Sequence, residues 1–351
     1  MRNVSPDAVG AEGVVAAPPP AAPRRRRWPP RLVIVIVALL ALAGTVSTFQ
    51  FLFGPPRTGY FRSLAGRDEY VAAYEEAMGA MPAPTTVHDL TTRWGTVRAY
   101  EWTLPGTEGS TPVVLLPGRA SGAPMWSENL AGFGNARRVV AVDALGDAGL
   151  SVQGVPMASV DDQAAWLHEV LDVLAPDGAH LVGHSFGAAT ASAYARHHPD
   201  DVVSLTLLEP VLTFGYPPAR MTAWAVIGSL PGLPDPVRET ALGKIGGADV
   251  DLIDPMARMV AVGSKEYVAA LPTPQVLADH QSAQLTMPVY VAIASRDSLA
   301  GGERAAVRAR SALPDGVVEV WPDTSHSLPM EVADLLGMRL QDFWAASEPA
   351  R

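Results

Sequence analysis

The stretch Leu181-Val182-Gly183-His184-Ser185-Phe186-Gly187 decides how this chain folds. An apolar run from Ala179 to Val182 leads into it, and small residues at helical spacing follow it as far as Arg196. This order is typical of a strand, a sharp turn and a buried helix. The glycines two residues before and after Ser185 let the strand and helix backbones approach closely. We therefore expect Ser185 to project its hydroxyl from the turn, at the positive end of a helix.

Two polar residues farther along the chain follow this turn in a meaningful order. Asp297 comes just after the apolar run 289–293, and His326 lies in a loop between the last predicted strand and the last predicted helix. On these residues the chain resembles the α/β-hydrolase superfamily, in particular its carboxylesterase and lipase-like members, from about Thr85 to the C-terminus. The resemblance implies an α/β fold with a mostly parallel eight-stranded sheet flanked by helices.

The resemblance also implies a catalytic triad. Ser185 would be the nucleophile and His326 the general base, with Asp297 accepting the Nδ1–H of the imidazole. Glu209 is the alternative acid, because some members of the superfamily carry the acid one strand earlier. His184 precedes the nucleophile, and we expect it to be buried and hydrogen-bonded rather than catalytic.

A second loop is expected to complete the site. The apolar run 113–116 is typical of a central parallel strand, and it ends in Pro117-Gly118-Arg119. In the superfamily this strand normally ends in His-Gly, so Pro117 is a departure. The resemblance implies an oxyanion hole formed by the backbone N–H groups of Arg119 and Phe186. Asp143 and Asp147 lie in the loop after the next strand, and we expect them to organise that loop.

A long connection separates two of the predicted strands. Residues 211–285 lie between them, whereas ordinary connections in such folds have about 2 to 6 residues. Proline and glycine punctuate apolar helical patterns in this segment. We expect a helical cap, which in the superfamily covers the substrate pocket.

The N-terminus differs in composition from the rest of the chain. Residues 1–31 are rich in Ala, Pro and Val and predict a disordered cytoplasmic tail. Residues 32–53 contain no charged side chain and are long enough to cross a bilayer as a helix. Arginines before this segment predict that the catalytic domain lies on the extracytoplasmic side. A cleaved signal with a site near Ala41-Leu42-Ala43 is the alternative, in which case the protein would be secreted.

Residues 54–84 are expected to link this anchor to the domain at 85–351, with a juxtamembrane helix from Tyr60 to Met78. Gly54-Pro55-Pro56 ends the apolar segment, and the helix would place Tyr70, Val71 and Tyr74 on one face. That spacing gives the predicted helix an apolar side.

Composition narrows the function. The formal net charge is −10, which disfavours a nucleic-acid partner. The chain has no cysteine, so a disulfide, a thiolate nucleophile and a cysteine-ligated metal are excluded. We expect hydrolysis of a small-molecule ester through an acyl-enzyme on Ser185, without cofactor or metal. Acyl transfer or peracid formation by the same triad, and a non-catalytic interaction module, are the alternatives.

Overall fold

A computed structural model describes residues 57–230 and 232–348. They belong to one compact unit, Pro56–Arg351, which is described here by itself. The predicted tail at 1–31 and the predicted membrane span at 32–53 lie outside the described residues. Among the described residues, no helix combines the length and the apolar character needed to cross a bilayer.

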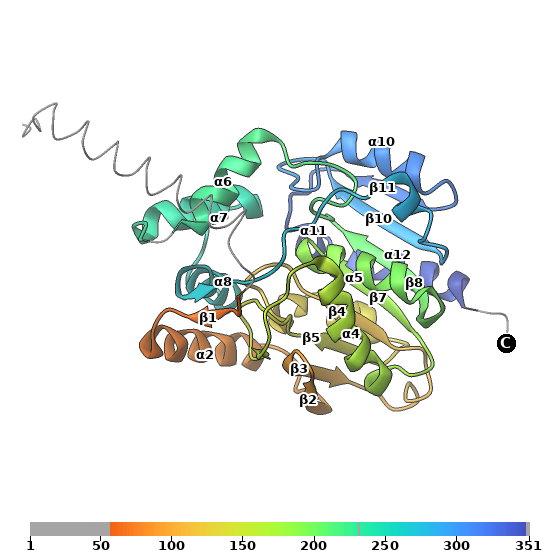
Figure 1. The fold of residues 1–351 in the computed structure, drawn as a ribbon, viewed down its shortest axis with the longest axis horizontal. Helices are drawn as coiled ribbons and strands as arrows, with labels where there is room; N and C mark the ends of the chain where they lie inside the picture. The colour runs from red at the N-terminus through yellow and green to blue at the C-terminus, as the bar shows by residue number, and fades with distance from the viewer. Residues whose placement is uncertain (1–56, 231, 349–351) are drawn as a thin grey trace, which may run out of the picture. The chain divides into compact units, whose positions relative to one another are not determined.

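A mixed sheet forms the centre of the unit (Figure 1). Its strand order is β11-β10-β8-β7-β4-β5-β3-β2, and the short β6 pairs with β3 as a ninth strand. Neighbouring strands are parallel from β11 to β5, and β3 pairs antiparallel with β5, β2 and β6. The strands span Thr86–Thr92 (β2), Gly95–Trp102 (β3), Val113–Leu116 (β4), Val139–Val142 (β5), Val152–Gln153 (β6), Ala179–His184 (β7), Val202–Leu208 (β8), Val289–Ala294 (β10) and Val317–Trp321 (β11). The predicted mostly parallel α/β sheet is confirmed, with one short strand more than expected.

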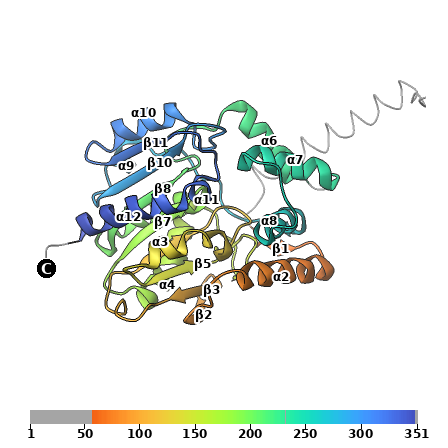
Figure 2. The same cartoon turned by 180° about the vertical axis from the view of Figure 1, so that it is seen from behind.

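Side chains of the central strands enter two separate cores because successive residues point to opposite faces of a sheet. Val114 and Leu116 pack in one cluster, and Val113 and Leu115 pack in the other. Helices α4, α5 and α10 cover the first face, and α3 and α12 cover the second (Figures 1 and 2). These helices span Leu130–Gly134 (α3), Val160–Leu174 (α4), Phe186–His197 (α5), Glu303–Ala312 (α10) and Ala333–Ser347 (α12). Both faces are therefore buried, which explains why β4 and β5 are continuous apolar runs.

The helix before the sheet is part of this unit. Helix α2 spans Leu64–Gly79, and the side chain of Ser63 caps its N-terminus by accepting a hydrogen bond from the Gly66 N–H. Tyr70 and Tyr74 of this helix are fully buried. The preceding strand β1 (Tyr60–Phe61) pairs with β9 (Tyr267–Val268), which follows the cap helices. The part of the expected linker 54–84 that the structure describes, from Arg57 on, thus packs into the hydrolase unit through Tyr70 and Tyr74.

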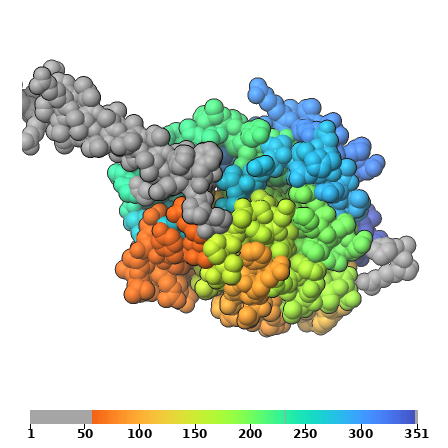
Figure 3. All heavy atoms as spheres, in the orientation of Figure 1, coloured from red at the N-terminus to blue at the C-terminus, as the bar shows by residue number. Residues whose placement is uncertain are grey.

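The predicted cap lies between β8 and β10. Its elements are α6 (Ala219–Ser229), α7 (Asp235–Gly246), α8 (Pro255–Glu266), β9 and α9 (Asp279–Ser282). Helix α8 packs against α2, and α6 packs against α7. In the space-filling view the cyan segment of the cap lies against the yellow-green segment that contains α4 (Figure 3). The helical character expected for residues 211–285 is confirmed.

Candidate active site

Ser185 occupies the sharp turn between β7 and α5. Its backbone φ is 56°, in a region that L-residues rarely adopt. A Cβ added to Gly187 would lie 2.2 Å from the Leu116 carbonyl oxygen, and one added to Gly183 would lie 2.5 Å from the Gly187 oxygen. Both positions therefore need glycine, as the sequence predicted, because strand and helix backbones meet there.

His326 connects the serine to a carboxylate. It follows β11 in a loop, and its Nε2 lies 3.0 Å from the Ser185 Oγ. Its Nδ1 lies 3.0 Å from Oε2 of Glu209. All three side chains are buried, with exposed fractions of 4% for Ser185, 7% for His326 and 0% for Glu209. The structure therefore brings together the predicted serine, the predicted histidine and the alternative acid.

Glu209 is held firmly by donors around its carboxylate. Its Oε1 accepts hydrogen bonds from the Ala294 N–H at 2.8 Å and from the Ser298 hydroxyl at 2.7 Å. Its Oε2 accepts from the Leu299 N–H at 3.0 Å and the Ala300 N–H at 3.3 Å, in addition to the imidazole. These hydrogen bonds hold the buried Glu209 carboxylate in one orientation beside His326.

The prediction that Asp297 contacts the imidazole is wrong in this structure. The Asp297 Oδ1 pairs with the Arg220 guanidinium of α6 at 2.5 Å, and its side chain is partly exposed. Glu209 and Asp297 follow neighbouring parallel strands, β8 and β10, so both acids lie at the same edge of the sheet. The turn that carries Asp297 contributes its N–H groups to Glu209 instead of its own carboxylate to the histidine.

His184 lies directly against the catalytic loop. Its Nε2 is 2.9 Å from the carbonyl oxygen of His326, and the two rings have centroids 4.8 Å apart. Burial, and to a lesser extent the nearby His326 ring, lower the pKa of His184 to about 3. The expectation that His184 is buried and hydrogen-bonded is confirmed.

The loop after β4 lies next to the nucleophile. A Cβ added to Gly118 would be 3.3 Å from the Ser185 Cβ, so this loop runs against the turn. Asp147 fixes the loop by accepting a hydrogen bond from the Ala120 N–H at 2.9 Å. Neither the Arg119 N–H nor the Phe186 N–H donates a hydrogen bond to another described residue. Both predicted oxyanion-hole donors are thus free to bind a ligand, and that role stays a prediction.

The two loop aspartates have the structural role that the sequence predicted. Asp143 is fully buried and accepts hydrogen bonds from the Ala123 N–H at 2.7 Å and the Leu150 N–H at 2.6 Å. Burial raises the pKa of both Asp143 and Asp147. Their hydrogen bonds hold the loops that flank the nucleophile.

Apolar side chains of the cap pack beside Phe186, the residue that follows Ser185. Val211, Met221 and Leu299 form a small buried cluster, and Phe186 and Trp224 pack against it. This cluster joins the cap helix α6 to the residues that follow Ser185 and Glu209.

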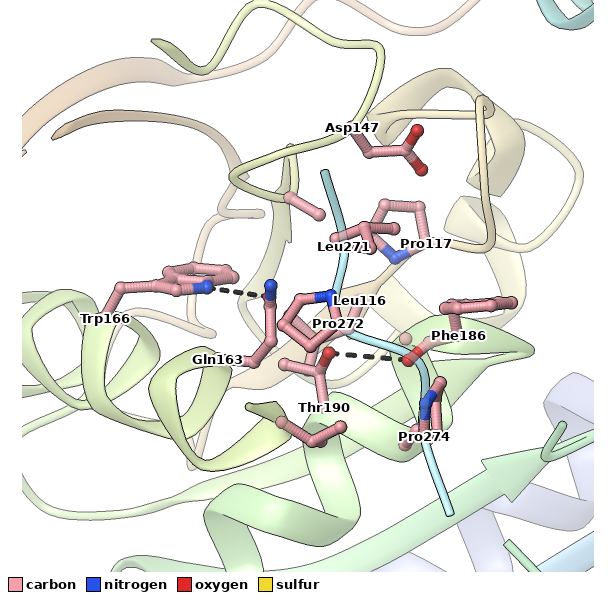
Figure 4. A pocket seen from close by; sticks show the side chains of 14 residues that line it. Leu116, Pro117, Asp147, Gln163, Trp166, Phe186, Thr190, Leu271, Pro272 and Pro274 are labelled. Atoms are coloured by element: carbon pink, nitrogen blue, oxygen red, sulfur yellow. Dashed lines mark hydrogen bonds between the residues drawn. The ribbon is translucent and has the colours of Figure 1, made fainter. Parts of the chain in front are cut away.

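A small cavity lies on the other side of Phe186. The strap formed by residues 271–274 crosses it, and Figure 4 shows Leu271 and Pro272 of this strap beside Pro117 and Phe186. Its volume of about 20 Å³ is enough for roughly one water molecule. An ester substrate therefore does not fit this cavity as it stands.

One group among the described residues has the composition of a metal site, but it lies elsewhere. His168, His198 and Asp201 place possible ligand atoms within 4.8 Å of one another, near the C-terminal end of α5. The two imidazoles stack with centroids 3.9 Å apart and planes 15° from parallel. Both Nδ1 atoms lie near Oδ2 of Asp201, at 3.9 Å for His168 and 3.8 Å for His198, so the group is interpreted as two imidazoles that share one carboxylate.

Two residues near the triad, Ser298 and Arg220, belong to no recognisable sequence motif. The Ser298 hydroxyl donates a hydrogen bond to Glu209, and Arg220 on the cap forms an ion pair with Asp297. Each contact joins residues that are distant in the sequence, so the local sequence pattern does not predict it.

Comparisons with known proteins agree with this geometry. The pattern that describes the alpha/beta hydrolase family matches residues 113–336, more than half of the chain. Carboxylesterase YbfK of Bacillus subtilis is 23% identical over 81% of this chain and 96% of its own length. The uncharacterized carboxylesterase nap of the same organism is 24% identical over 79% of this chain and 92% of its own length.

Solved structures show the same fold. The crystal structure of CesB (YbfK) superposes with a TM-score of 0.74, at 21% identity, over 81% of this chain and 99% of that one. The structure of a membrane phospholipase A superposes with a TM-score of 0.65, at 17% identity, over 92% of this chain and 100% of that one. With the match to the family pattern, these findings show that the chain belongs to the alpha/beta hydrolase family.

Proposed function

We propose that this protein is a serine carboxylesterase in which Ser185, His326 and Glu209 form the catalytic triad. The observation that carries the proposal is the position of His326, which lies 3.0 Å from both the Ser185 oxygen and the Glu209 carboxylate. The carboxylesterase relatives, which match over most of their length, support the same reaction class.

The geometry accounts for each step of an acyl-enzyme reaction. His326 removes the proton from the Ser185 hydroxyl through Nε2 as the oxygen attacks the ester carbonyl. Glu209 accepts the Nδ1–H and stabilises the imidazolium that forms. The same imidazolium then protonates the leaving alcohol, and water repeats the cycle to release the acid.

The free N–H groups of Arg119 and Phe186 are proposed to bind the oxyanion. Phe186 is the first residue of α5, so its N–H points out of the N-terminus of a helix. Preorganised donors at such a position stabilise the developing negative charge, and the loss of one typically costs about 10²- to 10³-fold in rate.

The lining of the site favours an apolar group on the substrate. Val211, Met221 and Leu299 carry no charge and lie beside Phe186. An ester with an aliphatic or aromatic group would bury that group against this cluster, at about 25 cal/mol per Å² of apolar surface.

Turnover tests the reaction class. The full chain, purified in detergent, is assayed on p-nitrophenyl esters of increasing acyl length beside Ser185→Ala and, as a matched control, the exposed cap serine variant Ser229→Ala. We expect Ser185→Ala to lose about 10⁴-fold or more in kcat and Ser229→Ala to keep wild-type turnover. Equal turnover in wild type and Ser185→Ala would refute the proposal.

We further propose that residues 32–53 anchor the protein in a membrane, with the hydrolase unit on the extracytoplasmic side. The uncharged length of this segment and the arginines before it support the proposal. A neighbour titled a membrane phospholipase A, which covers 92% of this chain, is consistent with it.

The absence of cysteine gives a clean test of this orientation. Single cysteines are introduced by Glu108→Cys, at an exposed position of the hydrolase unit, and by Ser5→Cys. A membrane-impermeant maleimide should label Glu108→Cys in intact cells and Ser5→Cys only after lysis. The reverse pattern would contradict the orientation, and recovery of unanchored protein in the medium would favour signal cleavage.

A further inference from the structure

We propose that His184 is a positioning residue that locks the His326 loop against the nucleophile through its Nε2–H. The inference rests on the proposed function, because it concerns how the catalytic base is held. His184 is the last residue of β7 and the immediate neighbour of Ser185 in sequence. It therefore links the strand that carries the nucleophile to the separate loop that carries the base.

The hydrogen bond fixes which nitrogen of His184 carries the proton. The His326 carbonyl oxygen can only accept, and it lies 2.9 Å from Nε2 of His184. Nε2 must therefore be the donor, and in the neutral ring Nδ1 holds a lone pair. The pKa of His184, lowered to about 3 mainly by burial, keeps the ring neutral at the pH values where an esterase works.

The other edge of the His184 ring faces the loop after β4, at Gly118. The Nδ1 atom is buried and has no hydrogen-bond partner among the described residues. A Cβ added to Gly118 would lie 2.8 Å from it, so glycine is needed for this loop to pass the ring. The imidazole of His184 is thus wedged between the Gly118 backbone and the His326 backbone, on either side of Ser185.

This arrangement is suited to holding a catalytic base whose charge changes during the reaction. The His184 and His326 rings lie with centroids 4.8 Å apart, so a second cation there would oppose the imidazolium. A neutral ring avoids that repulsion while its donor keeps the His326 backbone fixed. The Nε2 of His326 can then stay 3.0 Å from the Ser185 oxygen and its Nδ1 3.0 Å from Glu209.

Two amide substitutions separate the hydrogen bond from the bulk of the side chain. In His184→Gln the side-chain nitrogen can reach the position of Nε2 and donate to the His326 carbonyl. In His184→Asn the shorter side chain places its nitrogen near the position of Nδ1, so the carbonyl loses its donor. Both replacements are polar and neutral, and neither touches the Ser185 hydroxyl.

The measurements are kcat per active site, KM and the pH dependence of kcat/KM for a p-nitrophenyl ester, with the full chain in detergent. Active sites are counted by labelling with a fluorophosphonate, so that misfolded molecules do not enter kcat. We expect His184→Asn to lower kcat by about 10- to 100-fold with KM changed less than about 3-fold. We also expect the acid limb of its profile to move to lower pH, because a displaced imidazolium pairs less well with Glu209.

His184→Gln should keep kcat within about 3-fold of wild type and leave the acid limb in place. Wild-type kcat and acid limb in His184→Asn would overturn the inference. Equal losses in the Asn and Gln variants would also overturn it, because bulk rather than the hydrogen bond would then matter. Absence of turnover and labelling in the wild-type protein would instead overturn the proposed function.

Discussion

Three residues at the site have a strained backbone conformation. Ser185, Glu209 and Asp297 all have positive φ, at 56°, 45° and 43°. Each follows a parallel strand and turns the chain sharply where the strand ends. Such strain is typical of functional sites and persists only where the surrounding structure enforces it.

Substitution of the two acids distinguishes their roles. Glu209→Gln keeps the shape of the side chain but removes the charge that orients His326, so kcat should fall by about 10² to 10⁴. Asp297→Asn loses an ion pair with Arg220 that is largely exposed, so kcat should change less than about 3-fold. Steady-state kinetics on one p-nitrophenyl ester checks both. A larger loss in Asp297→Asn than in Glu209→Gln would restore the original sequence-based assignment.

The sequence predicted the pairing of Ser185 with His326 but favoured the wrong carboxylate as the partner of the imidazole, for a physical reason. Ser185 lies in a motif whose glycines are required locally, and His326 lies in a loop at a recognisable place in the chain. Glu209 and Asp297 each follow a strand and each carry a carboxylate. Which of them reaches the imidazole depends on how the turn at 294–300 folds around its neighbour, and no local pattern encodes that.

Helix α2 stabilises the loops beside Ser185 through a hydrogen bond to Asp143. The Tyr74 hydroxyl lies 2.9 Å from Oδ2 and 3.0 Å from Oδ1 of Asp143. Asp143 in turn accepts from the N–H groups of two loop residues, Ala123 and Leu150. The helix was predicted from its apolar face, but its docking was not, because the contact spans distant parts of the chain.

Removing this hydroxyl should destabilise the unit. Tyr74→Phe leaves a fully buried carboxylate without one of its donors, which costs about 1 to 3 kcal/mol in the free energy of unfolding. Tyr60→Phe, at a half-exposed tyrosine of β1, is the control and should change it by less than about 0.5 kcal/mol. Urea unfolding followed by circular dichroism measures both. Equal stability of the two variants would show that α2 does not brace the loop.

The cap, residues 211–285, packs next to the elements that carry the site. The serine and histidine beneath it are nearly inaccessible, and the cavity beside Phe186 admits only about one water molecule. The Ser325 hydroxyl lies 2.7 Å from the Gly246 carbonyl at the end of α7, so the cap contacts the loop that carries His326.

For the whole molecule, two buried histidines make stability depend on pH. Burial lowers the pKa of His180 to about 4 and that of His184 to about 3, whereas an unfolded chain has histidines near 6.5. Between about pH 6.5 and pH 4 the unfolded state binds more protons, so the folded state loses stability as the pH falls. Each histidine contributes a slope of up to about 1.4 kcal/mol per pH unit.

Urea unfolding at pH 7, 6 and 5 measures this slope. In His180→Gln the slope should decrease by about 1 kcal/mol per pH unit between pH 6 and pH 5. Glu348, a partner of His180, has a lowered pKa, so its own effect on stability appears at a pH below this window. An unchanged slope in His180→Gln would contradict the assignment of a buried neutral histidine.

Most of the fold could be predicted from the sequence. The residue at which the hydrolase unit begins could not. Buried strands such as β4 and β7 read directly as apolar runs, and the long segment before β10 indicated the cap. The place where the hydrolase unit begins could not be read in this way. Strand β1 pairs with β9, about 200 residues later in the chain, and that pairing leaves no trace in local spacing.

Covalent trapping of the acyl-enzyme shows directly whether Ser185 is the nucleophile. The full chain is mixed with a p-nitrophenyl ester, quenched with acid during the first turnover, digested and analysed by mass spectrometry. We expect the acyl group to be attached to the peptide containing Ser185, at the serine oxygen, and Ser185→Ala to carry no adduct. Rapid ester turnover with no adduct on Ser185, or with an adduct on another residue, would contradict it.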